Sequence, residues 1–312
     1  MPVYIIDKPL NFTSHDVVAK TRKLLKTRAV GHAGTLDPLA TGVLVVLTEE
    51  ATKLSPFLIE SDKHYLAWVT FGVGTPTLDA EGPISATADA SHITKEMIED
   101  KLPRFLELKE QLPPQYSAIK KAGVKGYEAA RKGESLDLPP RPAGYHKIEL
   151  LEFKGSRYDI STTFGLTPDG IWKTKARGIS FNLPPLLQDG STALFYLTVK
   201  AGTYIRAFAR DLGEAFGVPA HLSGLVRTRA GKSDLERAIR LEDIPNQPGL
   251  SMTDVLPYPL MTLSDEEVLR VRNGQRLTLQ FESRAGLVTP SNDLVAVVEN
   301  INGKMNFLRV WQ

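Results

Sequence analysis

Hydrophobic positions along the chain alternate in some segments and cluster in others, and this pattern predicts several strands of one sheet. The segments VYIID (3–7) and HYLAWVTFG (64–72) alternate well enough to be strands, while VLVVLT (43–48) is a fully apolar run suited to the centre of a sheet. A further strand is predicted at LFYLTVK (194–200). Together these segments predict a mixed sheet.

Apolar positions spaced three and four residues apart predict helices between the strands. We expect a first helix capped by Thr13 or Ser14, a second over 94–106, a short one at YEAARKG (127–133) and one over 205–216. The apolar side of the first helix contains Val17, Thr21, Leu24 and Leu25, and that of the last contains Ile205, Phe208, Ala209, Leu212 and Phe216.

Two later segments interrupt this pattern. Residues 153–193 are rich in Gly, Ser, Thr and Pro and have weak periodicity, which indicates an insertion within a larger domain. The linker IPNQPG (244–249) is followed by LVAVVE, NING and KMNFLRVWQ, a pattern typical of a hairpin with a four-residue turn. We therefore expect one domain over 1–250 and a small β module over 251–312.

The composition removes several kinds of chemistry. The 312 residues include no cysteine, which excludes disulfides, thiol nucleophiles and thiolate metal sites. The six histidines are scattered without the close pairs of common metal sites, so we expect no metal. Because no apolar run is long enough to span a bilayer, we expect a soluble, cytoplasmic protein.

Charge is balanced overall but basic in places. The formal net charge is only +2, which does not by itself indicate a nucleic-acid partner. However, KKAGVKGYEAARK (120–132) holds five basic residues and one acid, and 200–240 holds eight basic residues against four acids. Such stretches can neutralise phosphates, although ordinary solvated helix faces have the same composition.

One acidic residue, Asp37, lies in the glycine-rich loop GHAGTLDPLATGVL (31–44). An aspartate in such a loop most often caps a turn through its own backbone, and that interpretation stays open. Nevertheless, a carboxylate among apolar groups costs free energy unless a cation or hydrogen-bond donors compensate it. Arg206, which lies off the apolar stripe of its predicted helix, is the candidate cation.

The consecutive residues Ser14, His15 and Asp16 do not form a catalytic triad, because consecutive helical residues point in different directions.

Five segments, taken in order, resemble the TruB type tRNA pseudouridine synthases. The loop GHAGTLDPLATGVL resembles the catalytic loop of that family. The other four are IIDKPLNFTSHDVVAKTRKLL, SDKHYLAWVTFGVGTPTLDAEG, LPPQYSAIKKAGVKGYEAARKG and KAGTYIRAFARDLGEAFGVPAHLSGLVRTRAGKS. The resemblance implies an α+β pseudouridine synthase fold, with a central mixed, largely antiparallel sheet flanked by helices. The C-terminal module is similar to a PUA domain.

The resemblance implies the isomerisation of uridine to pseudouridine in the T loop of tRNA, at position 55 of the standard numbering. Asp37 would be the nucleophile, attacking either the sugar or the base, and Arg206 would pair with it and favour its ionised form. Tyr65 matches the tyrosine that packs on the target ring and can assist removal of the C5 proton. This chemistry requires no cofactor and no metal.

Further residues match positions that bind the substrate. His32 matches the histidine that enters the RNA where the target base has left, because a base must be extruded before its glycosidic bond can be reached. Tyr204 and Leu225 match positions that line the pocket. Asp79 matches an acid of the surrounding polar network, and Lys8 belongs to the first motif, which it shapes more than it touches the reacting atoms.

The resemblance also implies the partners. We expect tRNA, recognised through the shape of its T arm, with the basic stretches as phosphate contacts. We expect a monomer without a membrane association or an obligatory protein partner. Two alternatives remain: a guide-RNA-dependent synthase subunit, and an RNA-binding or tRNA-folding protein in which catalysis is secondary. Within the insertion, Trp172 and its basic neighbours Lys173, Lys175 and Arg177 either extend the contact with RNA or belong to a tolerated surface loop.

Overall fold

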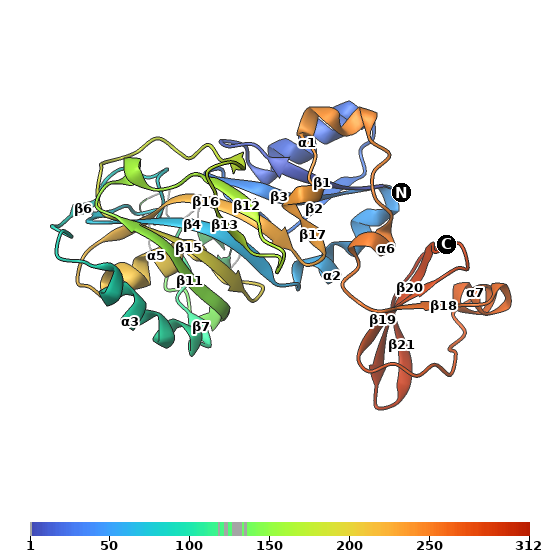
Figure 1. Ribbon diagram of the computed structural model, residues 1–312. Helices are drawn as coiled ribbons and strands as arrows, with labels where there is room; N and C mark the ends of the chain where they lie inside the picture. The colour runs from blue at the N-terminus through green and yellow to red at the C-terminus, as the bar shows by residue number, and fades with distance from the viewer. Residues whose placement is uncertain (1, 118, 122–123, 127–132, 134–135) are drawn as a thin grey trace.

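The computed structural model describes residues 2–117, 119–121, 124–126, 133 and 136–312. Its centre is an eight-stranded sheet in the order β1-β3-β16-β4-β15-β11, with β2 paired to β3 and β17 paired to β16 (Figure 1). Within this sheet only the β16–β3 pair is parallel, so the predicted mixed, largely antiparallel sheet is confirmed. The strands are β1 (Val3–Lys8), β2 (Val30–Ala33), β3 (Ala40–Thr48), β4 (Lys63–Phe71), β11 (Tyr145–Lys154), β15 (Thr192–Val199), β16 (Ala220–Ala230) and β17 (Ser233–Asp234).

Short elements connect the strands of this sheet. The predicted helix at 127–133 falls on residues of which 127–132 lie outside the described part of the chain. The short strands are β5 (Val73–Gly74), β6 (Ala86–Thr87), β7 (Glu110–Gln111), β8 (Lys120–Lys121), β9 (Val124–Lys125) and β10 (Arg141–Pro142). The short helical turns are η1 (Glu49–Leu54), α2 (Ser55–Ile59), η2 (Arg157–Asp159), η3 (Leu235–Arg237) and η4 (Leu241–Asn246).

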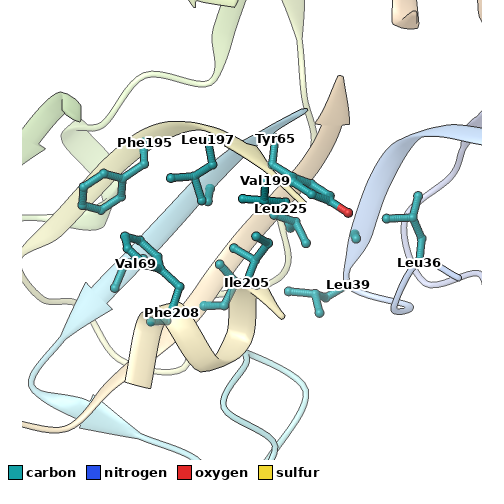
Figure 2. Packing of buried hydrophobic residues seen from close by; sticks show 14 of the residues in the cluster. Leu36, Leu39, Tyr65, Val69, Phe195, Leu197, Val199, Ile205, Phe208 and Leu225 are labelled. Atoms are coloured by element: carbon teal, nitrogen blue, oxygen red, sulfur yellow. The ribbon is translucent and has the colours of Figure 1, made fainter. Parts of the chain in front are cut away.

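Three helices pack into one apolar cluster with the central strands. They are α1 (Ser14–Leu25), α3 (Lys95–Leu106) and α5 (Ile205–Glu214), close to the predicted ranges. Thr13 is the N-cap of α1 and forms a capping box with Asp16, which satisfies backbone donors that a helix start leaves free. Figure 2 shows how Phe208 and Ile205 of α5 approach Val69 and Leu225 of the sheet.

The insertion is a small folded layer over the other side of the sheet. Its strands β12 (Thr163–Leu166), β13 (Trp172–Thr174) and β14 (Ile179–Ser180) form a separate three-stranded sheet. Phe164 packs edge-to-face on Trp68 of β4, with the ring centroids 5.6 Å apart, and the indole of Trp68 donates to the carbonyl of Ser161 at 3.1 Å. The insertion is therefore folded and packed, since its apolar side chains complete a core, and whether it is a tolerated addition stays a prediction.

Burial also corrects the hypothesis that Trp172 presents an aromatic surface to RNA. Its side chain is only 2% exposed and packs against Phe181, so its ring is not free to stack on a base. The neighbouring Lys173 forms an ion pair with Glu149 of β11 at 3.3 Å. The alternation of β13 buries the aromatic side chain and leaves the lysine outside, because successive strand residues point to opposite faces.

The C-terminal module is a four-stranded sheet in the order β18-β19-β20-β21, accompanied by short helices. Ile301 pairs with Lys304, so Asn302 and Gly303 alone form the turn of the last hairpin. The predicted four-residue turn is wrong because the strands continue pairing through Asn300 and Ile301. The elements are α6 (Met252–Val255), β18 (Leu260–Thr262), α7 (Asp265–Arg272), β19 (Arg284–Val288), β20 (Leu294–Ile301) and β21 (Lys304–Val310).

This module is docked on the segment between β3 and β4 (Figure 1, red and orange, near α2). The indole of Trp311 donates to the carbonyl of Glu50 at 3.1 Å, and Arg284 forms an ion pair with Glu60 at 2.6 Å. Apolar side chains of the module, Trp311 and Val288 among them, belong to the same buried cluster as those of the central sheet. Within the described residues, no helix is both long and apolar enough to cross a bilayer.

Replacement of Trp172 tests the folded layer. We expect Trp172→Ala to lower the free energy of unfolding by about 3–5 kcal/mol, because a large buried ring is removed from a packed interface. Urea unfolding followed by circular dichroism measures this change. As a control, Tyr158→Ala removes a ring that is 78% exposed and should change stability by less than about 0.5 kcal/mol. Equal effects of the two variants would contradict the packing described here.

Candidate active site

The loop that carries Asp37 connects β2 to β3 and is held by hydrogen bonds to the start of α1. The hydroxyl of Ser14 donates to the carbonyl of Leu36 at 3.1 Å and accepts from its N–H at 2.9 Å. The N–H of Asn11 donates to the carbonyl of Pro38 at 2.9 Å. Ser14 is therefore part of the support of the loop, and these contacts fix the backbone immediately before and after Asp37.

Lys8, at the end of β1, supports the same loop. Its fully buried ammonium donates to three backbone carbonyls, those of Pro9, Phe12 and Pro38. Burial lowers the pKa of Lys8 to about 8, since an interior position disfavours the charged form. These contacts support the interpretation that Lys8 shapes the first motif, and its role in substrate binding stays a prediction.

Arg206, in the first turn of α5, faces Asp37. Its Nε lies 2.9 Å from Oδ2 of Asp37, and its Nη2 donates to Oδ1 at 3.2 Å. The guanidinium also donates to the carbonyls of Thr77 and Tyr116, each at 3.0 Å. The predicted pairing of Asp37 with Arg206 is thus confirmed, and the two roles in catalysis stay predictions. The Asp37 side chain keeps 35% of its surface exposed, whereas that of Arg206 keeps 8%.

Asp79 joins this pair from the loop after β5. Its Oδ2 lies 3.5 Å from Nε of Arg206, and its Oδ1 accepts from the hydroxyl of Thr77 at 2.6 Å and from the N–H of Glu81 at 3.0 Å. Nε of Arg206 therefore lies near two carboxylates and is aligned as a hydrogen-bond donor to neither. Burial raises the pKa of Asp79, while Arg206 and the hydroxyl of Thr77 act in the opposite direction.

An apolar wall lies beside the carboxylates. Tyr65 of β4 and Leu225 of β16 are buried, and Figure 2 shows the hydroxyl of Tyr65 pointing toward the loop that carries Leu36. Leu39 and Ile205 complete the wall from the catalytic loop and from α5 (Figure 2). The structure thus brings an aromatic ring and aliphatic side chains next to an ionic pair, an arrangement suited to a flat, partly apolar ring.

Tyr204 and His32 lie at the margins of this site. Tyr204 is the N-cap residue of α5, and its N–H donates to the buried amide oxygen of Gln111 at 3.0 Å. The half-buried ring of His32 in β2 packs edge-to-face on His15 with centroids 5.7 Å apart. Burial first, and then His15 and Arg227, lower the pKa of His32 to about 4, so its ring is neutral at neutral pH.

Several residues of the site were not anticipated from the sequence. They are Thr77, which contacts Asp79, Gln111, which contacts Tyr204, and Ser14, which contacts Leu36. Thr77 and Asp79 stand close together in TPTLDAEG, which is a local signal, but nothing local links Gln111 to Tyr204. In the part of the chain that the structure describes, no group of three or more His, Cys, Asp or Glu could hold a metal ion.

Comparisons with known proteins agree with this geometry. Residues 22–165, which include Asp37, Tyr65 and Asp79, match the family described as TruB family pseudouridylate synthase (N terminal domain). The tRNA pseudouridine synthase B of a Thermus thermophilus strain is 49% identical over 311 residues, covering 100% of this chain and 99% of that protein. That of Deinococcus deserti is 45% identical and covers 100% of both chains.

A solved structure supports the fold. A chain of a Cbf5-Nop10-Gar1 complex matches 100% of this chain and 85% of its own length, with a TM-score of 0.69 and 24% identity. At that identity the likeness concerns the architecture of the chain.

Removal of Arg206 tests the electrostatic arrangement independently of function. In Arg206→Met, Asp79 and Asp37 lose their cation, so the already raised pKa of Asp79 should rise further. The folded state then binds more protons than the unfolded state, and stability falls as pH rises. We expect a loss of about 3 kcal/mol at pH 8 and a smaller loss at pH 5, measured by urea unfolding. Arg240→Met, at an exposed position, is the control and should show no such difference between the two pH values.

Proposed function

The chain belongs to the TruB family of pseudouridylate synthases, and from this premise we propose that it isomerises uridine to pseudouridine in the T loop of tRNA, at position 55 of the standard numbering. One observation carries the proposal. Asp37, partly open to solvent, is held by two nitrogens of the buried Arg206 at the edge of an apolar wall that contains Tyr65 and Leu225.

The reaction rearranges bonds without a net gain or loss of atoms. The glycosidic bond from N1 to the sugar breaks, the detached uracil turns, and C5 forms a new bond to the same sugar carbon. C5 then loses its proton and N1 ends with one, so the atoms balance. Asp37 is the nucleophile, on the sugar or on the base. The guanidinium of Arg206 lies against both oxygens of this carboxylate, with Nε 2.9 Å from Oδ2 and Nη2 donating to Oδ1 at 3.2 Å, and so orients it.

Tyr65 and Leu225 hold the uracil ring between binding and release. An aromatic ring packs on a base through its face, and an apolar wall excludes water from the detached base. The hydroxyl of Tyr65, which points toward the catalytic loop (Figure 2), is placed to assist removal of the C5 proton. Tyr204, at the start of the helix that carries Arg206, lines the same pocket.

The target uridine must leave the folded T loop before it reaches Asp37. Extrusion of a base costs a few kcal/mol of stacking and pairing, and a ring that takes its place offsets part of this cost. We assign this role to His32. Its pKa of about 4 keeps the imidazole uncharged, so the ring can stack without carrying a charge between bases.

We propose tRNA as the partner, bound through the shape of its T arm and through phosphate contacts of the basic stretches. The module over 251–312 is proposed to be PUA-like and to extend the contact surface beyond the domain over 1–250. Its contacts through Trp311 and Arg284 hold that surface in a fixed orientation relative to α2 and η1. We propose that the chain acts as a monomer in the cytoplasm.

The reaction itself provides the test. Purified protein is incubated with unmodified tRNA transcript, without guide RNA and with a chelator, and pseudouridine is mapped at single-nucleotide resolution. We expect one modified uridine in the T loop. Asp37→Asn should lower the rate on the order of 10⁴-fold or more, because the nucleophile is lost while the shape is retained. The exposed Asp159 supplies the matched control, and Asp159→Asn should keep the full rate.

Other outcomes identify the alternatives. If the wild-type protein binds the transcript and leaves every uridine unchanged, the enzymatic proposal falls and a guide-dependent or RNA-binding function replaces it. The guide-dependent alternative is favoured only by the fold likeness at 24% identity, whereas full-length relatives at 45 and 49% identity are named tRNA pseudouridine synthase B. A separate role in tRNA folding predicts that Asp37→Asn still refolds a misfolded transcript.

A further inference from the structure

A second buried arginine, Arg227 of β16, contacts the backbone on both sides of Asp37. Its side chain is 1% exposed. Nη2 donates to the carbonyl of Gly34 at 3.0 Å and Nη1 to that of Thr35 at 3.3 Å, both before Asp37. Nε donates to the carbonyl of Val43, beyond Asp37, at 2.7 Å. One guanidinium thus spans the base of the catalytic loop.

This arginine has no carboxylate partner among the described residues. All three of its contacts are to backbone carbonyls, and no acidic oxygen within the described ranges lies at ion-pair distance from it. A buried charge costs more free energy than an apolar side chain of similar size, so stability alone does not favour an arginine here. The three donors instead fix the relative positions of two chain segments.

The surrounding backbone leaves little freedom for this contact to vary. Gly42 lies beside Arg227 in the parallel β3–β16 pairing, and a Cβ on Gly42 would lie 2.3 Å from the carbonyl oxygen of Arg227. Its φ of +91° is also unfavourable for other residues. Leu225, two residues before Arg227 on the same strand, contributes to the apolar wall. One strand therefore positions both the wall and the loop.

We propose that Arg227 is a positioning residue for the isomerisation: it holds the loop so that the Asp37 carboxylate stays against the guanidinium of Arg206. This inference rests on the proposed function and extends it to a residue that does not touch the substrate. Arg227 acts through the backbone at Gly34, Thr35 and Val43, so its loss should displace Asp37 without removing any group that contacts RNA. A small displacement of a reacting group lowers the rate of the chemical step much more than binding.

Arg227→Lys is the principal test. Lysine keeps the positive charge, but a single ammonium cannot reproduce the three directions of the guanidinium. We expect the single-turnover rate of pseudouridine formation to fall at least tenfold, with the Kd for tRNA within twofold of wild type. Amide hydrogen exchange should become faster in residues 34–40 and stay unchanged in β4 and β15.

Arg157→Lys is the matched control. Nη2 of Arg157 donates to the carbonyl of Ser223, on the same strand β16, at 3.5 Å, and burial lowers the pKa of Arg157. Its hydrogen bonds do not involve the catalytic loop. This variant should keep the single-turnover rate and the Kd within twofold of wild type. The comparison separates the loss of a guanidinium that contacts β16 from the loss of the contacts that Arg227 makes with the loop.

Two results would overturn the proposal. A folded Arg227→Lys protein with the wild-type rate would show that the loop does not need the three hydrogen bonds of the Arg227 guanidinium. Rate and affinity falling together, with faster exchange throughout the sheet, would show that Arg227 acts only on stability. If Arg227→Lys does not fold, Gly34→Ala displaces the acceptor side of the same contact, and a wild-type rate in that variant sinks the proposal. If the wild-type protein itself makes no pseudouridine, the proposed function fails, and the exchange measurement still tests the positioning of the loop.

Discussion

The ion pair between Arg206 and Asp37 is the contact on which the arrangement of the site depends. The guanidinium of Arg206 joins segments that are distant in the sequence: the loop of Asp37, the loop of Thr77 and Asp79, and the chain at Tyr116. Each of these segments presents an acceptor, and the arginine is almost fully buried among them. Since an unpaired buried guanidinium would be very costly, the segments are held together as a set rather than as independent pairs.

The same loop is fixed from the opposite side by contacts to its backbone. Ser14, Lys8 and Arg227 donate to carbonyls between Gly34 and Val43, and each of these contacts is to the backbone. The side chain of Asp37 is thus oriented by one group while its backbone is held by others. This division leaves the carboxylate accessible to a substrate and still restricts its movement.

The sequence predicted much of this structure, and the failures have physical reasons. Periodicity identified β1, β3, β4 and β15 of the central sheet and the helices α1, α3 and α5, because burial on one face sets a period that can be read locally. It did not identify β2, β11 or β16. The need to compensate the charge of Asp37 led to Arg206, 169 residues away. Gln111 and Arg227 could not be identified in this way, since the contacts that link them to the site are to backbone groups, which leave no mark in the sequence. The fold of the insertion could not be predicted because its aromatic residues are separated by polar turns, and the pairing of β12 with β13 and β14 brings them together.

The central sheet is covered by protein on both faces, and successive residues of one strand pack against different layers. Trp68 and Leu66 of β4 face the layer formed by the insertion, while Tyr65 and Val69 of the same strand face the cluster that contains α5. With both faces occupied by protein, an RNA molecule can approach only the loops and edges of the sheet. Substitutions in the core between the sheet and the insertion therefore alter the stability of the scaffold, whereas substitutions in the loops alter which RNA is accepted. A lineage of such proteins can change its substrates and its thermal tolerance along separate evolutionary routes.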